Sequence, residues 1–413
     1  MKRPALEVVD ARSRHACLAA TTFDEASAIL EHHASALGTE TVSLRDCVGR
    51  VLASPVYSQI DAPRTHVSAM DGYAVDDADL DRGIAVFDLV GESFPGNPLA
   101  KQLGVGETVR IFTGAPIPAG SIRVIPQENA SLTGTKVTFS NSRGLKRHIR
   151  TCGSDFKTGD VLLETGALIE PRHLVAIAGG DAATTTVARQ PSICFIATGD
   201  ELSEPGRANF SNQIPESISH SLAAFVEQWG GRTVASHILP DEPTMIANAV
   251  RDGLANADVI VMIGGASKGS RDFAKAALQP LGLILHFSEV AMKPGKPIWY
   301  GRIGRTHILG LPGNPTAAIT TARLFLAPLM RALVGRPYRS ALDWIQVPTR
   351  SAISRGDGRD QFLCAQWHEG FVSASVRQEA SSQIMLVCSN ALLRRRRFAE
   401  MADPGTSTEV LLI

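Results

Sequence analysis

The stretch Val259-Ile260-Val261-Met262-Ile263-Gly264-Gly265 decides the fold class of this 413-residue chain. Its five consecutive apolar residues predict a strand that is buried on both faces, and the glycine pair predicts a tight turn after it. Similar apolar runs occupy residues 193–196 and 308–311, and helical patterns at residues 221–229, 245–254 and 316–333 lie between or after these runs. This alternation predicts right-handed βαβ units on a parallel sheet, so residues 190–337 are expected to form an α/β domain.

Four other regions flank this domain. Residues 1–21 carry mixed charge without periodicity and are expected to be a flexible N-terminus. Residues 22–74 and 151–189 form a predicted mixed α/β N-terminal domain, with helices expected from residue 22, at 43–52 and at 174–178. Residues 75–150, rich in Gly and Pro with short Val, Ile and Phe runs, predict a β-rich inserted domain. Residues 338–413 predict a small C-terminal β domain, which makes the chain a multidomain α/β protein.

Composition excludes several classes of partner. The chain has 41 Lys and Arg against 41 Asp and Glu, and this balance provides no long-range field to hold nucleic acid or an anionic membrane. No apolar run is long enough to span a bilayer, and the N-terminus lacks the apolar core of a signal peptide. The six cysteines are scattered without a CxxC pair, which favours free thiols in a reducing compartment. We therefore expect a cytoplasmic protein, in which the run Arg394–Arg397 is a solvated patch.

Three loops that follow the apolar runs form the predicted ligand site. They comprise residues 198–202, 264–272 and 311–316, and ligands of open parallel sheets bind outside the carboxyl ends of the strands. The glycine-dense loop at 264–272 opens a helix and suits an anion, although a tight turn without ligand is equally compatible. Asp272 beside a bound phosphate would require a bridging Mg²⁺, whereas taken alone it is better explained as a helix cap.

Two proline-framed segments add candidates for anion binding. Lys293-Pro294-Gly295-Lys296-Pro297 holds two ammonium groups on a rigid frame. A solvated charge pair is one interpretation, but the framing prolines favour a rigid cationic clamp for a phosphate or oxyanion. Leu311-Pro312-Gly313-Asn314-Pro315 directly precedes a helix, and its two prolines make the loop stiff and fix the direction of its N–H groups at low entropy cost. The same stiffness is equally compatible with an ordinary turn that binds no ligand.

Seven collinear motifs resemble those of the molybdopterin molybdenumtransferase family, which includes MoeA and the E domain of gephyrin. They are SAMDGYAV at 68–75, TGAPIP at 113–118, the segment 150–155, TGDEL at 198–202, GGASKGSRD at 264–272, KPGKP at 293–297 and LPGNP at 311–315. The resemblance covers roughly residues 22–337. It implies insertion of molybdate into adenylylated molybdopterin, with Mg²⁺-dependent cleavage of the phosphoanhydride and release of AMP. It also implies a homodimer and contact with the molybdopterin adenylyltransferase.

The resemblance carries site residues onto this chain position by position. The implied catalytic residues are Asp71, Glu201, Asp272, Lys293 and Lys296. The implied substrate-binding residues are Thr113, Arg150, Asp155, Gly264, Gly265, Ser267, Gly269, Pro312, Gly313, Asn314 and Pro315. The implied Mg²⁺ ligands are Asp241, Asp272 and Glu201. The chain departs from the family pattern at residues 64–67, at Lys268 and at residues 214–219.

Two other functions are compatible with parts of the sequence. The α/β domain is also similar to that of molybdopterin adenylyltransferases, but stand-alone enzymes of that kind lack the SAMDGYAV and TGAPIP motifs. A non-catalytic scaffold or cofactor-binding protein would not need Asp71, Glu201, Asp272 and both lysines, since paired charges are costly to bury. ATP consumption with free molybdopterin would indicate the first alternative.

Overall fold

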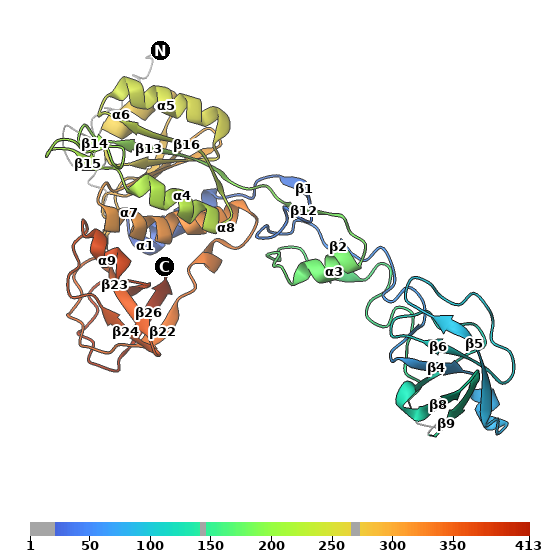
Figure 1. The fold of residues 1–413 in the computed structure, drawn as a ribbon. Coiled ribbons are helices and arrows are strands. Elements are labelled where there is room, and N and C mark those ends of the chain that lie inside the picture. The colour runs from blue at the N-terminus through green and yellow to red at the C-terminus, as the bar shows by residue number, and fades with distance from the viewer. Residues whose placement is uncertain (1–20, 141–145, 266–272) are drawn as a thin grey trace, which may run out of the picture. The chain divides into compact units, whose positions relative to one another are not determined.

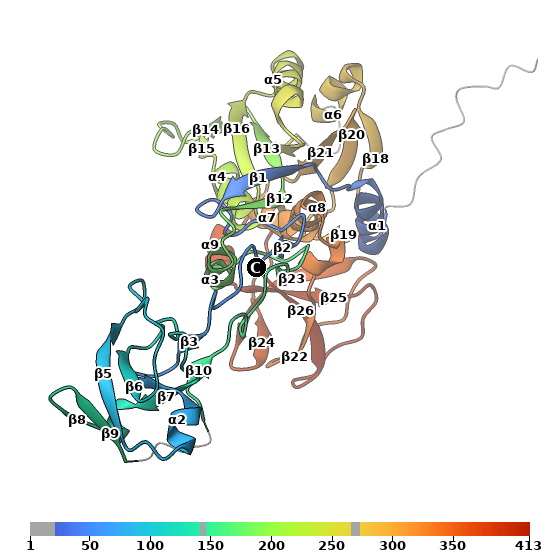
Figure 2. The same cartoon turned by 90° about the vertical axis from the view of Figure 1, so that its right-hand side faces the viewer.

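The structure is a computed structural model that describes residues 21–140, 146–265 and 273–413 (Figures 1 and 2). The chain divides into two compact units, of which one comprises residues 1–39 and 188–413 and the other residues 40–187. A search of the described helices finds none with the length and apolar character that crossing a bilayer requires.

The first unit contains the α/β domain that the apolar runs predict. Its six-stranded sheet has the order β16-β13-β17-β21-β20-β18, and the first four strands are parallel. β20 runs antiparallel to both of its neighbours, β21 and β18, and neither β20 nor β18 was predicted from the sequence. The strands are β13 (Ser192–Thr198), β16 (Arg232–Leu239), β17 (Val259–Ile263), β18 (Ile284–Phe287), β20 (Trp299–Ile303) and β21 (Thr306–Leu311). A two-stranded parallel ladder, β14 (Leu202–Ser203) with β15 (Ile214–Pro215), follows β13.

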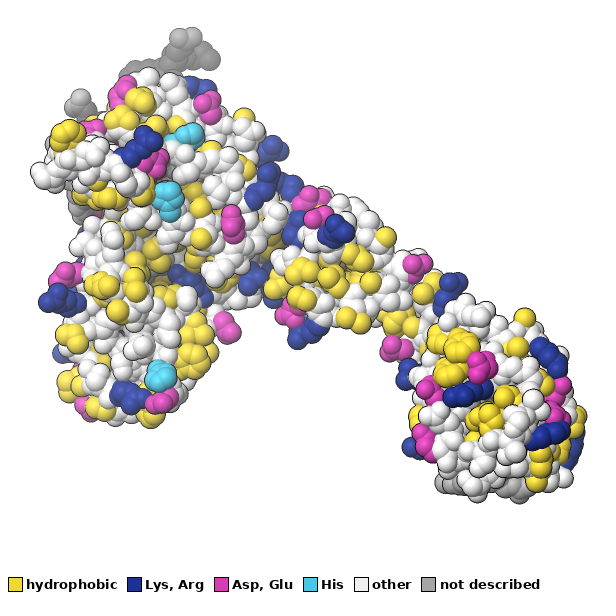
Figure 3. All heavy atoms as spheres, in the orientation of Figure 1, with side chains coloured by type: hydrophobic (Ala, Val, Ile, Leu, Met, Phe, Trp, Pro, Cys, Tyr) yellow, Lys and Arg dark blue, Asp and Glu magenta, His cyan; other side chains and the backbone are white. Residues whose placement is uncertain are grey.

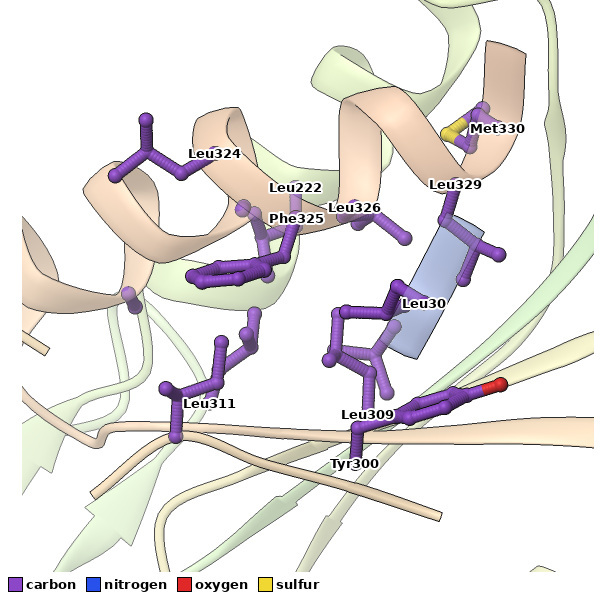
Figure 4. Close-up of a cluster of buried hydrophobic side chains, with 14 of the residues drawn as sticks. Leu30, Leu222, Tyr300, Leu309, Leu311, Leu324, Phe325, Leu326, Leu329 and Met330 are labelled. Carbon is purple, nitrogen blue, oxygen red and sulfur yellow. The ribbon is translucent and has the colours of Figure 1, made fainter. Parts of the chain in front are cut away.

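Helices cover both faces of this sheet, as the strand burial predicts. One face packs against α1 (Phe23–His33), α4 (Ile218–Gln228) and the continuous helical segment α7 (Pro315–Thr321), a π-helical stretch (Ala322–Leu326) and α8 (Ala327–Leu333). Figure 4 shows Phe325 and Leu329 from this segment facing Leu311 and Leu309 of β21. The opposite face packs against α5 (Pro243–Asn256) and α6 (Phe273–Leu278). The carboxyl ends of the parallel strands are therefore held rigidly between two helical layers.

Helix α1 differs from its predicted place in the N-terminal domain. It belongs to the unit that contains the α/β sheet. The reason is aromatic packing, because the Phe23 ring lies 5.4 Å from the ring of Phe325 and 5.0 Å from that of Phe362, measured between centroids. A capping box between Thr22 and Glu25 begins the helix.

The C-terminal residues form the predicted β domain. Its sheet has the order β19-β23-β25-β26-β22, with β24 paired to β23. The strands are β19 (Met292–Lys293), β22 (Ile345–Pro348), β23 (Asp360–His368), β24 (Phe371–Ala374), β25 (Ala391–Arg395) and β26 (Ser407–Leu412), and α9 (Gln383–Val387) lies between β24 and β25.

The prediction that Arg394–Arg397 is a solvated patch is wrong for its first half. Arg394 and Arg395 are buried at the end of β25. The Arg394 guanidinium lies 4.9 Å from the centroid of the Phe23 ring and pairs with Asp360 at 3.3 Å. Burial raises the pKa of Asp360, and the charge of Arg394 opposes that rise. Aromatic faces and a carboxylate thus replace water around this cation.

The second unit consists of two β-containing parts. A six-stranded sheet with the order β7-β4-β6-β5-β9-β8 matches the predicted β-rich insert. Its strands are β4 (Gly72–Val75), β5 (Val86–Ser93), β6 (Glu107–Ile111), β7 (Arg123–Pro126), β8 (Ala130–Thr133) and β9 (Lys136–Phe139), with α2 (Asp77–Asp81) after β4. The second part contains α3 (His173–Gly179) and the strand pairs β1 (Thr39–Ser43) with β12 (Thr184–Ala188), β2 (Val56–Tyr57) with β11 (Val161–Leu163), and β3 (Val67–Ser68) with β10 (Ile149–Arg150).

The helix expected at residues 43–52 is absent from this described segment, which forms turns instead. Its backbone hydrogen bonds cross to a distant segment, since Gly49 N–H donates to the carbonyl of Ile169 and Leu52 N–H donates to that of Ala167. Cys47 and Leu52 pack into a core with Ile169 and other residues of that segment. The apolar spacing suited a helix, but long-range packing decided the structure.

Candidate functional site

Three loops converge at the carboxyl edge of the parallel sheet, as predicted. They follow β13, β17 and β21, which are neighbours in the sheet. Gly264 has φ +86°, and a side-chain carbon at this position would lie 2.7 Å from the carbonyl oxygen of Thr198. A side-chain carbon at Gly313 would lie 3.4 Å from the Cα atom of Gly264. The three loops therefore pack backbone against backbone, and the positive φ and the 2.7 Å approach require glycine at position 264.

These loops enclose a cavity of about 740 Å³, which we call the carboxyl-edge cavity. Its size lies within the range of pockets for small organic ligands. The cavity brings together the predicted site residues Glu201, Asp241, Gly264, Gly265, Pro312, Gly313, Asn314 and Pro315. Residues of the C-terminal domain, Ser381 and Gln383, complete the wall.

The described lining of the carboxyl-edge cavity is acidic. It includes the carboxyl groups of Glu201, Glu216 and Asp241, and no Lys or Arg among the residues that the structure describes. The hydroxyl of Thr198 is buried at the wall and has no hydrogen-bond partner in the described part of the chain. Because an anionic ligand would be repelled by these carboxylates, the cavity suits a cation or a ligand that arrives with one.

Glu216 is a cavity residue that the sequence analysis did not select. Its Oε1 accepts hydrogen bonds from the backbone N–H groups of Ile218 at 2.8 Å and Ser219 at 2.9 Å, and its side chain is buried. The Ser219 hydroxyl donates to its other oxygen. The carboxylate thus caps the start of α4, where negative charge is favourable. A glutamate just before an apolar helical pattern was the signal that could have identified this role.

The two predicted lysines do not line the carboxyl-edge cavity. Lys293 lines a separate cavity of about 390 Å³, which we call the lateral cavity, together with Thr316, Gln361 and Gln378. The Lys296 ammonium lies 3.5 Å from the carboxylate of Glu289. Pro297, which ends the same motif, does reach the carboxyl-edge cavity. The structure therefore places Lys293 and Asn314, both candidates for anion binding, at two different cavities.

Asp272, Ser267 and Gly269, like Lys268, lie outside the described residues. The predicted roles of these residues remain predictions.

The remaining predicted site residues lie in the second unit. Oδ1 of Asp71, before β4, accepts hydrogen bonds from the backbone N–H and the hydroxyl of Thr113, each at 2.7 Å. These two bonds hold the pKa of the Asp71 carboxyl below its ordinary value. Arg150 ends β10, opposite Val67 of β3, and its side chain is exposed. Asp155 is also exposed, and its N–H donates to the carbonyl of Ala62 at 3.0 Å.

A second hydrogen-bonded carboxylate, that of Asp61, lies in the same unit and was not predicted. The carboxylate of Asp61 accepts hydrogen bonds from the N–H of Thr158 at 2.8 Å and from its hydroxyl at 2.9 Å. The Cys152 thiol donates to the other oxygen of Asp61 at 3.4 Å, and this bond is the main reason why the pKa of the thiol is raised. Cys152 is therefore held in its unreactive, protonated form.

Comparison with known proteins finds a matching family model for each half of the chain. Residues 21–180 match the family model described as the MoeA N-terminal region (domain I and II). Residues 194–332 match the model described as a probable molybdopterin binding domain.

Full-length relatives extend this likeness. The chain is 35% identical over 336 residues to the molybdopterin molybdenumtransferase of Haemophilus influenzae, covering 81% of each protein. It is 30% identical over 366 residues to the enzyme of the same name from Nostoc sp., covering 86% of this chain and 84% of the relative. The fold resembles the crystal structure of the molybdopterin biosynthesis MoeA protein from Pyrococcus horikoshii, with a TM-score of 0.82, 22% identity and coverage of 95% of this chain and 99% of that one.

Proposed function

Because this chain belongs to the molybdopterin molybdenumtransferase family, an enzyme family of molybdenum cofactor biosynthesis, we propose that it inserts molybdate into adenylylated molybdopterin. In the proposed reaction the phosphoanhydride that joins molybdopterin to the nucleotide is cleaved and AMP is released. We further propose that the enzyme acts as a cytoplasmic homodimer that receives its substrate from the molybdopterin adenylyltransferase.

The observation that carries this proposal is the acidic lining of the carboxyl-edge cavity. A phosphoanhydride would be repelled by Glu201 and Asp241 unless a cation lay between them. Oxygen ligands from one or two carboxylates together with substrate phosphates are the donor set that Mg²⁺ prefers, and this chemistry supports a Mg²⁺ ion at Glu201 and Asp241. Glu201 and Asp241 would hold it, with Asp272 as a proposed third ligand. When bound, Mg²⁺ supplies Lewis-acid polarisation of the phosphoanhydride.

We propose that residues of the carboxyl-edge cavity bind and orient the substrate. Gly264 and Gly313 let the loop backbones approach a ligand closely, and the buried Thr198 hydroxyl offers a donor that nothing in the described residues uses. Asn314 and Pro315 form the stiff wall opposite, which limits the freedom of a bound substrate. Gly265 and Pro312 line the same wall, and Ser267 and Gly269 are proposed to extend it.

The lysines and the second unit have separate proposed roles. Lys293, in the lateral cavity, would hold molybdate as a tetrahedral oxyanion, with Lys296 nearby in the same motif. Asp71, Thr113, Arg150 and Asp155 are proposed to bind substrate in the assembled dimer. The fixed, ionised Asp71 carboxylate could orient a hydroxyl or amine of the substrate.

Turnover tests the proposal directly. The purified protein is incubated with adenylylated molybdopterin, and AMP release is followed with and without molybdate and Mg²⁺. We expect AMP only when both are present, together with active molybdenum cofactor. AMP release that does not depend on molybdate, or ATP consumption with free molybdopterin, would refute the proposed reaction, and the second result would support adenylylation instead. Binding of the substrate without turnover would indicate a scaffold.

A further inference from the structure

A second large cavity lies at the opposite edge of the α/β sheet. It has a volume of about 500 Å³, and we call it the amino-edge cavity. Its wall includes the residues at which the parallel strands begin, since Ser192 starts β13, Arg232 starts β16, and Asp258 directly precedes β17. The end of α5 and residues 35–38 close its sides. The cavity is thus built within one unit and is remote, along the strands, from the carboxyl-edge cavity.

The amino-edge cavity is strongly cationic. Four arginines line it, and Asp258 is the only carboxylate among the described residues of its wall, so the formal charge of the lining is +3. The arginines are Arg189, Arg232, Arg302 and Arg305. Figure 3 shows dark blue Lys and Arg side chains gathered on the surface beside the end of α5, and the end of α5 also lines the cavity.

Asp258 cannot neutralise more than one of these cations. Its two oxygens accept hydrogen bonds from the Arg189 guanidinium at 2.7 and 3.1 Å, and Ser192 donates two more, from its N–H and its hydroxyl. Burial alone would raise the pKa of Asp258, but these bonds more than offset that effect and hold its pKa low. Asp258 is therefore ionised and fully occupied by Arg189 and Ser192.

The other three arginines have no ion pair within the described part of the chain. Arg232 and Arg305 are exposed, whereas Arg302 is half-buried and its Nε is inaccessible and lacks a hydrogen-bond partner among the described residues. One terminal nitrogen of Arg302 donates to the carbonyl of Arg305 at 3.3 Å. A buried guanidinium nitrogen without an acceptor is unfavourable, and a guanidinium cannot lose its charge to relieve it.

A neighbouring histidine does not change this balance. Burial, followed by the charge of Arg302, lowers the pKa of His307 to about 4. Because of this low pKa, His307 is neutral near pH 7. The imidazole lines the cavity without adding charge, so the excess positive charge comes from the arginines alone.

We propose that the amino-edge cavity binds a small molecule carrying a phosphate or diphosphate group, held by Arg232, Arg302 and Arg305. The planar guanidinium forks match phosphate oxygens two at a time, and three of them around one cavity suit a group with several negative charges. The volume leaves space for an organic portion beside the phosphate. This site is distinct from the proposed catalytic site and does not depend on the proposed reaction.

Pyrophosphate is the probe for the experiment. Its binding to the full-length protein is measured by isothermal titration calorimetry in EDTA, so that a cation-dependent catalytic site does not contribute. The test variant is Arg232→Gln combined with Arg305→Gln, because both side chains are exposed and should be dispensable for folding. The control, Arg350→Gln combined with Arg355→Gln, removes the same charge from two exposed arginines of the C-terminal domain. A second test variant, Asn256→Asp, adds a carboxylate to the cavity wall.

We expect saturable one-to-one binding to wild type and to the control, and at least about tenfold weaker binding to both test variants, as loss of charge-assisted hydrogen bonds requires. Thermal unfolding confirms that each variant is folded, and AMP release should be retained in both test variants. The proposal is overturned if wild type shows no saturable heat, or if the control loses as much affinity as the test variants. A change of oligomeric state in the Arg232→Gln, Arg305→Gln variant would also overturn it, because it would assign these arginines to a protein interface.

Discussion

Pro315 and Thr316 are consecutive residues at the start of α7, yet Pro315 lines the carboxyl-edge cavity and Thr316 lines the lateral cavity. The first turn of one helix therefore forms the partition between two binding spaces. The carboxylates lie on one side of it and Lys293 lies on the other. In the proposed reaction, this separation would let an organic phosphate and an inorganic oxyanion bind side by side.

Replacing Lys293 by Gln should therefore affect one substrate selectively. We expect the KM for molybdate to rise at least about tenfold, because a charge-assisted hydrogen bond is lost, with little change in the KM for adenylylated molybdopterin. Steady-state kinetics with each substrate varied in turn measures both values. Arg377→Gln, which removes an exposed charge from the same region, is the control. An equal rise in both KM values would show that the two substrates share one space.

The acidic wall predicts a dependence on Mg²⁺. Glu201→Gln and Asp241→Asn should each lower the rate of AMP release roughly 100-fold at a fixed Mg²⁺ concentration, because each removes a proposed ligand. Part of the rate should return as Mg²⁺ is raised. Glu204→Gln changes a nearby exposed carboxylate outside the cavity and should behave as wild type. Wild-type Mg²⁺ dependence in both ligand variants would remove these residues from the metal site.

The close approach of the site loops predicts that alanine substitution is more harmful at Gly264 than at Gly282. Gly264 has φ +86° and Gly282 has φ +88°, but only at Gly264 would a side-chain carbon meet another backbone. Alanine at either position should cost about 1–2 kcal/mol for the left-handed conformation. Gly264→Ala should lose more than this in urea unfolding and also lose AMP release, whereas Gly282→Ala should remain active. Equal losses of stability would mean that the contact with Thr198 is relieved without strain.

Burial of His307 predicts a component of the pH dependence of stability. The pKa of this imidazole falls from 6.5 to about 4 on folding, first through burial and then through the charge of Arg302. Between pH 6.5 and 4, the imidazole is therefore protonated in the unfolded chain but not in the folded chain. The contribution of His307 to the free energy of unfolding is complete above pH 6.5 and falls as the pH drops toward 4. The loss should amount to roughly 3 kcal/mol.

The His307→Gln variant should lack this component of the pH dependence. Its free energy of unfolding in urea, measured at several pH values, should vary less between pH 6.5 and 4 than that of wild type. His368→Gln, which changes a histidine whose side chain is 73% exposed, is the control and should retain the wild-type dependence. If His307→Gln had the wild-type profile, another group would be responsible.

Local patterns predicted the parallel part of the sheet because burial on both faces leaves a continuous apolar run, as in Val259–Ile263. The same rule placed the loops after β13, β17 and β21 at one edge. It could not predict that β20 runs antiparallel to its two neighbours, β21 and β18, because strand direction depends on how strands pair in the sheet.

Long-range packing also explains which features of the cavities could not be predicted from the sequence. The resemblance implied that Lys293 is a catalytic residue, but the pairing of β19 with β23 places it at a separate cavity beside the C-terminal domain. The arginines of the amino-edge cavity are scattered from Arg189 to Arg305 and form no local motif. They become neighbours because the sheet brings the beginnings of the parallel strands close to the end of the antiparallel strand β20 and the turn that follows it.

The pairing of β19 with β23 also limits how the gene for this protein can be cut or recombined. Met292 and Lys293 form hydrogen bonds with the C-terminal sheet, while β18 and β20 on either side of them in the chain belong to the α/β sheet. A chain ending at residue 337 would leave this ladder edge bare and would also expose Phe23, which packs on Phe362. The last 76 residues thus share a sheet and a core contact with the preceding part of the chain, and they cannot be exchanged as an independent domain.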